Sequence, residues 1–348
     1  MEQISDKKKV ENKEYIYSEN FILESGEKLP SIKIQYSTYG TFHKDKSKVV
    51  WICHALTANA DPVSWWSGLV GDGFLYNPDD YFIVCANILG SCYGTSGPVE
   101  IDPTTGNRYY LSFPSVTIRD MVAAHELLRV HLGIEKIHTC IGGSLGGQQA
   151  LEWSIIQPSL IDHLILMATN AFHSPWGIAF NEAQRMAIKA DPTWEDSTLN
   201  AGKTGLSAAR AMALLSYRTY ETYCKTQSEE SCEVTKGFRA ITYQQYQGEK
   251  LVKRFNTHSY LYLTHAMDSH NVGRGRGRAE KALAMVKSKT LLVGIKSDIL
   301  FPPSEQKYLQ KHIMGSFYKE IDSLYGHDGF LIETDEIARV IRDFYKKG

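Results

Sequence analysis

The stretch from residue 137 to residue 153 constrains the fold most strongly, because it combines an apolar strand, a glycine-rich turn and a helix. The turn is Gly142-Gly143-Ser144-Leu145-Gly146, which fits the G-x-S-x-G pattern of a nucleophile elbow. A serine at such a turn is strained, and side chains two positions before or after it would collide with the strand and the helix. Glycine occupies both positions. The pattern also fits an ordinary strand-to-helix turn or a phosphate-binding turn, so the rest of the chain has to distinguish these alternatives.

The length and charge of the chain narrow the class of protein. With 348 residues the chain can bury the core of one large α/β domain, with or without an insertion. Its 38 basic and 39 acidic residues leave a net charge of −1, which does not favour nucleic acid or an anionic membrane as partner. We therefore expect a small-molecule partner.

Neither a secretory signal nor a membrane span is indicated by the sequence. The chain has no apolar segment near its start and no run of about 18 apolar residues, so we expect a cytoplasmic protein. Its cysteines are scattered without the paired C-x-x-C spacing of a zinc site, so we expect no metal.

Short unbroken apolar runs predict the central strands of a parallel sheet, since strands covered on both faces do not alternate. These runs lie at residues 49–53, 82–86, 137–141, 164–167 and 290–295. Three earlier segments, 15–17, 21–23 and 33–39, alternate as half-exposed antiparallel strands do, and we place them at a sheet edge. Helical periodicity at 118–132 and 146–157 falls between buried strands. This order predicts an α/β fold with a mostly parallel sheet and helices on both faces.

Between residues 171 and 287 the pattern changes to amphipathic stretches without a buried strand. These stretches lie at 178–190, 207–226, 243–255, 260–268 and 278–286. We interpret 171–287 as a helical lid inserted over the carboxyl ends of the strands, where open α/β sheets bind ligands. The core would then comprise residues 13–170 and 288–348, and residues 1–12 would form a flexible tail. The glycine-arginine string at 273–278 predicts a turn with ion pairs rather than a nucleic-acid patch.

A catalytic serine needs a base to take its proton, and that base needs an acid to orient it. On chains with a serine elbow, the acid and the histidine follow in that order. Asp298 follows the strand that ends at residue 295, and His327 lies on a glycine-flanked loop after a strand at 317–321. Alone, Asp298 could cap a helix and His327 could be a surface histidine. Their order, each after a strand, favours a catalytic triad of Ser144, Asp298 and His327.

An acyl intermediate also needs N–H donors for its oxyanion. The backbone amide after the nucleophile, that of Leu145, is the first candidate. The second should come from the loop after the strand at 49–53, and we choose the amide of Leu56. His54, at the start of that loop, is interpreted as a packing residue.

Eight longer stretches, spread over nearly the whole chain, carry a resemblance to a known family. They are residues 54–57, 64–66, 87–98, 113–122, 142–153, 259–263, 273–277 and 325–331. Together they resemble the homoserine O-acetyltransferase family, whose members have an α/β-hydrolase fold with a helical lid and serve methionine biosynthesis. The departures are small: Leu145 stands where methionine is usual, and residues 267–271 are a local variant.

The resemblance implies transfer of an acetyl group from acetyl-CoA to the hydroxyl of L-homoserine by double displacement. Ser144 would carry the acetyl group between the two half-reactions, and no cofactor would be bound permanently. Because family members are usually dimeric, the resemblance also implies a homodimer, which we expect to form through the lid.

Homoserine is a zwitterion, so its site needs a cation for the carboxylate and an anion for the ammonium group. The family uses a lid arginine in an A-R motif and an acid next to the catalytic histidine, and the matching residues are Arg210 and Asp328. Tyr217 lies seven residues after Arg210 and would share its helix face, pointing into the cleft. Arg218 is our second choice for the carboxylate partner.

Other reactions use the same scaffold and triad. One alternative is a homoserine or serine acyltransferase that takes succinyl-CoA, and another is an esterase. Transferase and esterase differ in whether water reaches the acyl-serine, which depends on how the lid closes the pocket. The sequence does not distinguish these alternatives.

Overall fold

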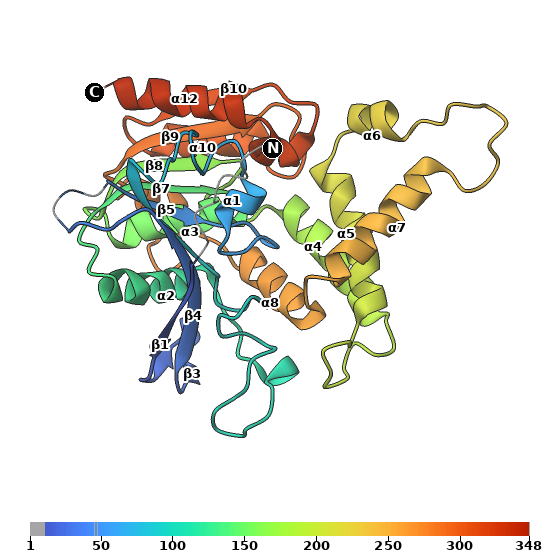
Figure 1. Ribbon diagram of the computed structural model, residues 1–348, viewed down its shortest axis with the longest axis horizontal. Coiled ribbons are helices and arrows are strands. Elements are labelled where there is room, and N and C mark those ends of the chain that lie inside the picture. The colour runs from blue at the N-terminus through green and yellow to red at the C-terminus, as the bar shows by residue number, and fades with distance from the viewer. Residues whose placement is uncertain (1–10, 45, 47, 348) are drawn as a thin grey trace, which may run out of the picture.

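The computed structural model describes residues 11–44, 46 and 48–347. Within them, an eight-stranded sheet has the order β1-β4-β6-β5-β7-β8-β9-β10 and carries helices on both faces (Figure 1). Its strands are β1 (Glu11–Tyr17), β4 (Ile32–Tyr39), β5 (Lys48–Cys53), β6 (Tyr81–Ala86), β7 (Ile137–Gly143), β8 (Ile161–Met167), β9 (Lys289–Ile295) and β10 (Phe317–Ile321). The six strands β5 to β10 pair in parallel with one another. β4 pairs antiparallel with β6, and β1 pairs antiparallel with β4, so these two strands extend the sheet at one edge. The predicted mostly parallel α/β sheet is confirmed.

The prediction for the sheet edge is only partly right. The segment expected at 21–23 leaves the main sheet, because β2 (Phe21–Ile22) pairs with β3 (Lys28–Leu29) in a separate two-stranded sheet. A tight turn between them, in which the Gly26 N–H donates to the Leu23 carbonyl at 2.8 Å, brings the two short strands together.

The tail predicted for residues 1–12 is too long by two residues. β1 begins at Glu11, and Glu11 and Asn12 pair with Thr38 and Ser37 of β4. The Ser37 hydroxyl also donates to the Asn12 side chain at 3.1 Å, so this end of the strand is held by more than its backbone. Residues 1–10 of the predicted tail lie outside the described residues.

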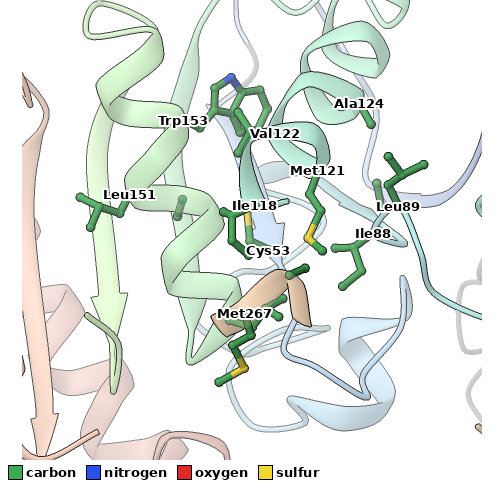
Figure 2. Close-up of a cluster of buried hydrophobic side chains, with 14 of the residues drawn as sticks. Cys53, Ile88, Leu89, Ile118, Met121, Val122, Ala124, Leu151, Trp153 and Met267 are labelled. Atoms are coloured by element: carbon green, nitrogen blue, oxygen red, sulfur yellow. The ribbon is translucent and has the colours of Figure 1, made fainter. Parts of the chain in front are cut away.

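Alternate side chains of the central strands enter two separate hydrophobic clusters, one on each face of the sheet. In β5, Trp51 and Cys53 belong to one cluster, and Val50 and Ile52 belong to the other. Both faces are covered, and this is why the strand sequences are apolar without alternation. Figure 2 shows part of the first cluster, to which three helices contribute Met121, Trp153 and Met267.

The core helices follow the predicted strand-helix alternation. They are α1 (Pro62–Trp65), α2 (Ile118–His131), α3 (Leu145–Ile156), α10 (Pro303–His312), α11 (Gly329–Ile332) and α12 (Thr334–Lys346), with the short 3₁₀ turns η1 (Tyr110–Ser112) and η2 (Gly326–Asp328). The two predicted helices at 118–132 and 146–157 correspond to α2 and α3. Residues of α2 and α3 lie in the first cluster, and residues of α12 lie in the second.

The segment between β8 and β9 forms the helices α4 (Pro175–Lys189), α5 (Lys203–Tyr217), α6 (Tyr220–Gln227), α7 (Arg239–Val252), α8 (Thr257–Asp268) and α9 (Ala279–Leu283). In Figure 1, α5, α6 and α7 extend away from the sheet on the right of the view. α8 is buried almost throughout its length and joins these helices to the core.

The prediction of one continuous amphipathic stretch at 207–226 is wrong. The helix is interrupted at Arg218 and Thr219, which separate α5 from α6. Both residues have extended backbone conformations. The Thr219 hydroxyl caps α6 by accepting from the Thr222 N–H at 3.0 Å. Thr219 and Thr222 also donate to the carbonyl of Leu324, which is distant in sequence. This contact with the loop before His327 outweighs the helical periodicity of the segment.

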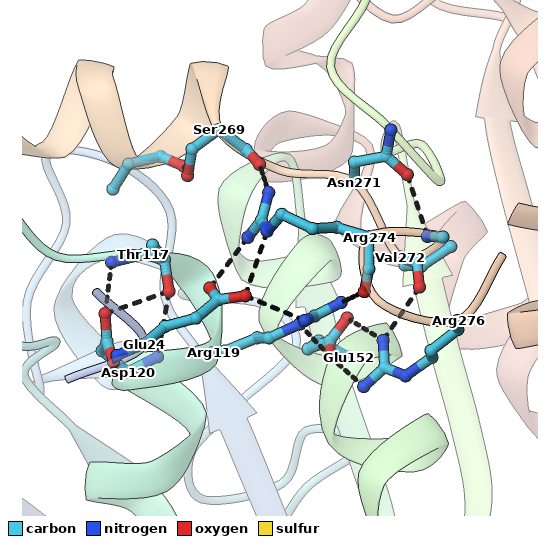
Figure 3. Close-up of polar contacts among 12 residues, drawn as sticks. Glu24, Thr117, Arg119, Asp120, Glu152, Ser269, Asn271, Val272, Arg274 and Arg276 are labelled. Atoms are coloured by element: carbon cyan, nitrogen blue, oxygen red, sulfur yellow. Dashed lines mark hydrogen bonds and ion pairs between the residues drawn. The ribbon is translucent and has the colours of Figure 1, made fainter. Parts of the chain in front are cut away.

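The glycine-arginine string forms a turn with ion pairs, as predicted. Arg276 lies 2.5 Å from Glu152 of α3, and Arg119 of α2 lies 3.0 Å from the same carboxylate (Figure 3). Arg274 lies 2.8 Å from Glu24, and Arg119 reaches Glu24 at the same distance. Burial opposes ionisation of Glu24, but the hydrogen bond from Arg274 and the charge of Arg119 lower its pKa to about 2. This network fastens the end of the lid segment to the helix that follows the elbow.

In the described ranges, 11–44, 46 and 48–347, the structure has no helix that is long and apolar enough to cross a membrane.

We expect Glu152→Ala to lower the free energy of unfolding by about 1.5–3 kcal/mol, because Arg276 would lose its carboxylate partner and Arg119 would keep only Glu24. The Glu152 side chain is only 1% exposed. Asp343→Ala is the matched control, since it removes an exposed carboxylate paired with Lys346, and it should cost at most about 1 kcal/mol. Urea denaturation at neutral pH measures both. Equal losses in the two variants would contradict a stabilising role for the Glu152 network.

Candidate active site

Ser144 lies at the junction of β7 and α3, with φ 56° and ψ −129°. This conformation is strained for a residue with a side chain, and it raises the hydroxyl above the end of the sheet. A Cβ on Gly142 would lie 2.3 Å from the backbone of Gly146, and one on Gly146 would lie 2.1 Å from the carbonyl oxygen of Cys53. The expected collision with strand and helix therefore accounts for both glycines.

The base and the acid lie together beside this turn. His327 Nδ1 is 2.7 Å from Asp298 Oδ2, and both side chains are buried. The other carboxylate oxygen of Asp298 accepts the backbone N–H groups of Leu300 and Phe301 at 2.8 and 2.9 Å. Asp298 therefore performs the capping role considered from the sequence and also orients His327. With Nδ1 bound to the acid, Nε2 is the nitrogen left for proton exchange.

Aromatic rings enclose the imidazole of His327. Phe301 stacks on it with ring centroids 5.1 Å apart, and Tyr217 and Phe330 lie at 5.7 and 5.4 Å. Burial lowers the pKa of His327, but the charge of Asp298 and its hydrogen bond outweigh burial, so the pKa is raised from its ordinary value of 6.5. A histidine with this pKa is a stronger base toward a serine hydroxyl.

The two proposed oxyanion donors come from different elements. Leu145 is the first residue of α3, whose amides lack partners inside the helix, and Leu56 follows β5 and lines the cavity beside Ser144. Over the described part of the chain, neither amide donates to another protein group. Both therefore remain available to a negatively charged oxygen.

His54 holds the loop that carries Leu56, which agrees with its interpretation as a packing residue. Its Nε2 accepts the Ile88 N–H at 3.1 Å, and its Nδ1 is 2.9 Å from the carbonyl of Ala55. Burial lowers the pKa of His54 to about 4, so the ring is neutral at physiological pH and can accept at one nitrogen and donate at the other.

One cavity of about 500 Å³ brings most of the predicted site residues together. Of the predicted residues, Ser144, His327, Leu56, Arg210, Tyr217 and Asp328 line it. Asp298 lies behind His327, and Leu145 is fully buried, so it can act only through its backbone.

The lid contributes a cation and an aromatic ring to this cavity. Arg210 and Tyr217 lie on α5, with the guanidinium 5.4 Å from the centre of the tyrosine ring. Asp328 faces them from η2, and Arg218 Nε lies 2.8 Å from its Oδ2. Burial raises the pKa of Asp328, and the charges of Arg218 and Arg210 oppose this rise. Arg218, our second choice for the carboxylate partner, is thus a partner of Asp328.

The sequence interpretation missed two basic residues in the cavity lining, Lys250 and Arg254. Arg254 donates to the carbonyl of Thr57 at 2.5 Å and to the hydroxyl of Tyr93 at 2.8 Å. The sequence did contain a signal for them, because these two basic residues lie one helical turn apart at the end of the amphipathic stretch 243–255. The partners of Arg254 were not visible in the sequence, because Thr57 is 197 residues away.

Comparisons with known proteins show the family and the fold of the chain. Residues 48–334 match the α/β hydrolase fold family. The homoserine O-acetyltransferase of Cyclobacterium marinum is 48% identical over 323 residues, which cover 93% of this chain and 92% of that protein. The crystal structure of the homoserine O-acetyltransferase from Staphylococcus aureus is 30% identical, with a TM-score of 0.81, and covers 97% of this chain and 95% of its own. Esterase E22, 23% identical with a TM-score of 0.88, covers 97% of this chain and 100% of its own and shares the fold.

We expect acylation of Ser144 by p-nitrophenyl acetate to rise with pH and to be half-maximal above pH 6.5. Only neutral His327 can accept the serine proton, and its pKa is raised from the ordinary value of 6.5. Asp298→Asn should slow acylation by roughly 1,000-fold or more and remove the raised midpoint. The p-nitrophenolate burst measures the rate.

Asp322→Asn is the control for this experiment, because Asp322 is an exposed carboxylate on the loop before His327. It should leave the pH profile unchanged. A midpoint below pH 6.5, or the same midpoint in Asp298→Asn, would overturn the assignment of this pair.

Proposed function

The chain belongs to the homoserine O-acetyltransferase family, on the α/β-hydrolase fold, and from this premise we propose that it transfers an acetyl group from acetyl-CoA to the hydroxyl of L-homoserine, a step of methionine biosynthesis. The observation that supports this proposal most strongly is that Ser144 and His327 line the same cavity as Arg210 and Asp328. A nucleophile with its base can form an acyl intermediate, and a cation with an anion can hold a zwitterionic acceptor.

In the first half-reaction, Ser144 Oγ attacks the thioester carbonyl while His327 Nε2 takes the hydroxyl proton. The amides of Leu56 and Leu145 donate to the oxyanion of the tetrahedral intermediate. The C–S bond then breaks, His327 returns the proton to the departing sulfur, and CoA leaves as a thiol. Acetyl-Ser144 remains.

In the second half-reaction, His327 takes the proton of the homoserine hydroxyl, whose oxygen attacks the acetyl carbonyl. The bond between the acetyl carbon and Ser144 Oγ breaks, and the proton returns to Ser144. Water competes for the same acetyl group, so the acceptor has to be held against the acyl-serine.

Arg210 and Asp328 supply this hold in the proposed complex. The guanidinium of Arg210, positioned against the Tyr217 ring, binds the homoserine carboxylate. Asp328 binds the ammonium group, whose charge favours the ionised carboxylate against the effect of burial.

A homodimer through the lid and a location in the cytoplasm are part of the proposal. Apolar side chains are exposed on the three lid helices that extend from the sheet. They include Leu215, Tyr220, Ile241 and Tyr246, which are 56%, 80%, 49% and 57% exposed. A second copy that covered this surface would remove these side chains from water, which supports dimerisation there.

We expect rapid CoA release when acetyl-CoA is supplied with L-homoserine, and much slower release with L-serine or water as the only acceptor. Succinyl-CoA should be the poorer donor. A thiol reagent measures the free CoA, and Ser144→Ala should lower the rate by several orders of magnitude. Equal release with water would favour an esterase, and faster release with succinyl-CoA or serine would change the assigned donor or acceptor.

We expect Arg210→Met to lower kcat/KM for homoserine by about 10- to 100-fold, because a charge-assisted contact with the carboxylate is lost. Acylation by p-nitrophenyl acetate should fall far less, since that ester has no carboxylate. Arg239→Met, which removes an exposed lid arginine at the start of α7, is the matched control. If Arg210→Met and Arg239→Met have the same steady-state constants, Arg210 does not bind the acceptor.

A further inference from the structure

Arg254 connects the lid segment to the loop that carries the Leu56 amide. We propose that Arg254 is a positioning residue that keeps this amide aimed at the oxyanion, so that acylation depends on a contact made by the lid. The inference rests on the proposed role of Leu56 and deepens the proposed function.

The guanidinium of Arg254 contacts two elements of the core. One nitrogen donates to the Thr57 carbonyl at 2.5 Å and to the Tyr93 hydroxyl at 2.8 Å, and the other lies 3.4 Å from the Thr57 hydroxyl. The neighbouring residue, Phe255, is buried against Tyr93 with ring centroids 5.6 Å apart. Phe255 thereby places Arg254 where its planar fork can reach both partners.

The loop beneath Arg254 is a single tight turn. The Ala58 N–H donates to the Ala55 carbonyl at 3.0 Å, which makes Leu56 and Thr57 its two central residues. Arg254 therefore binds the carbonyl of one central residue, and the other central residue, Leu56, lines the cavity beside Ser144. The Thr57 carbonyl shares its peptide group with the Ala58 N–H, and the Leu56 N–H shares its peptide group with the Ala55 carbonyl. The hydrogen bond between Ala58 and Ala55 therefore couples the orientation of the Thr57 carbonyl to that of the Leu56 N–H.

Other contacts hold the loop from the core, among them His54 Nδ1, 2.9 Å from the Ala55 carbonyl, and Trp65 Nε1, which donates to the Asn59 carbonyl at 2.9 Å. His54 binds Ile88 at the start of the loop, and the Asn87 side chain accepts the Ala60 N–H at 2.8 Å at its end. Arg254 is the contact at the centre of the turn, and it comes from the lid. A lid that moved away would release the centre of the turn and leave its two ends fixed.

The test compares Arg254→Met with Lys253→Met, which removes an adjacent exposed charge at the end of α7. Stopped-flow acylation is measured with p-nitrophenyl acetate and with acetyl-CoA. We expect Arg254→Met to slow both by a similar factor of about 10-fold or more, below the roughly 100- to 1,000-fold cost of deleting an oxyanion donor. Lys253→Met should acylate at the wild-type rate. Arg254→Lys should recover part of the loss, and Tyr93→Phe should reproduce a smaller loss.

A transition-state analogue separates positioning from a general effect on folding. A trifluoromethyl ketone that forms an oxyanion on Ser144 should bind Arg254→Met more weakly by the same factor as acylation slows, while the melting temperature stays within a degree or two of wild type. An unchanged rate with p-nitrophenyl acetate would overturn the proposal. If only the acetyl-CoA reaction slowed, Arg254 would instead bind the phosphates of CoA.

The uncharged ester keeps this test separate from the proposed function. If wild type fails to acetylate homoserine but is acylated by p-nitrophenyl acetate, the proposed function fails and the role of Arg254 can still be measured. If wild type acetylates homoserine and Arg254→Met is acylated normally, only the positioning role fails.

Discussion

The close backbone contact at the nucleophile turn is the constraint on which the rest of the site depends. Gly146 lies against the carbonyl of Cys53, so α3 is in contact with the end of β5. The Ser144 N–H donates to the Met167 carbonyl at 3.0 Å, and the Thr169 hydroxyl donates to the Ser144 carbonyl at 2.8 Å, so β8 holds the same turn. Three strands therefore set the position of one hydroxyl, and the strain at Ser144 persists because its neighbours cannot relax.

The two buried histidines near the site, His54 and His327, have pKa values shifted in opposite directions. His54 is buried without a carboxylate, and burial lowers its pKa to about 4, so it acts as a neutral connector. His327 is equally buried, but Asp298 raises its pKa and makes it a base. The acid beside it in sequence, Asp328, faces the acceptor side of the cavity and is paired with Arg218. In the proposed function, these two adjacent residues serve proton transfer and substrate binding, and they differ in the side chains placed opposite them.

The sequence was sufficient for features that depend on local pattern. Unbroken apolar runs identified β5 to β9, and the order of Ser144, Asp298 and His327 identified residues that the fold brings to one cavity or its wall. Features that depend on distant partners were not predictable. The break at Arg218 and Thr219 requires the carbonyl of Leu324, and the orientation of Arg254 requires Thr57. The separate pairing of β2 with β3 also had no signal, because the alternation at 21–23 predicts a strand but not which strand pairs with it.

Because the lid segment contacts the core at several points, we expect its sequence and that of the core to be constrained together during evolution. Thr219 is bound to the loop before His327, Arg254 to the loop after β5, and Arg276 to the helix after Ser144. Exchange of the whole segment for one that lacks Thr219, Arg254 and Arg276 would break contacts at three elements of the site at once. A lineage with this architecture would diversify its acceptor by single substitutions within the cavity, and its lid and core would have to change together.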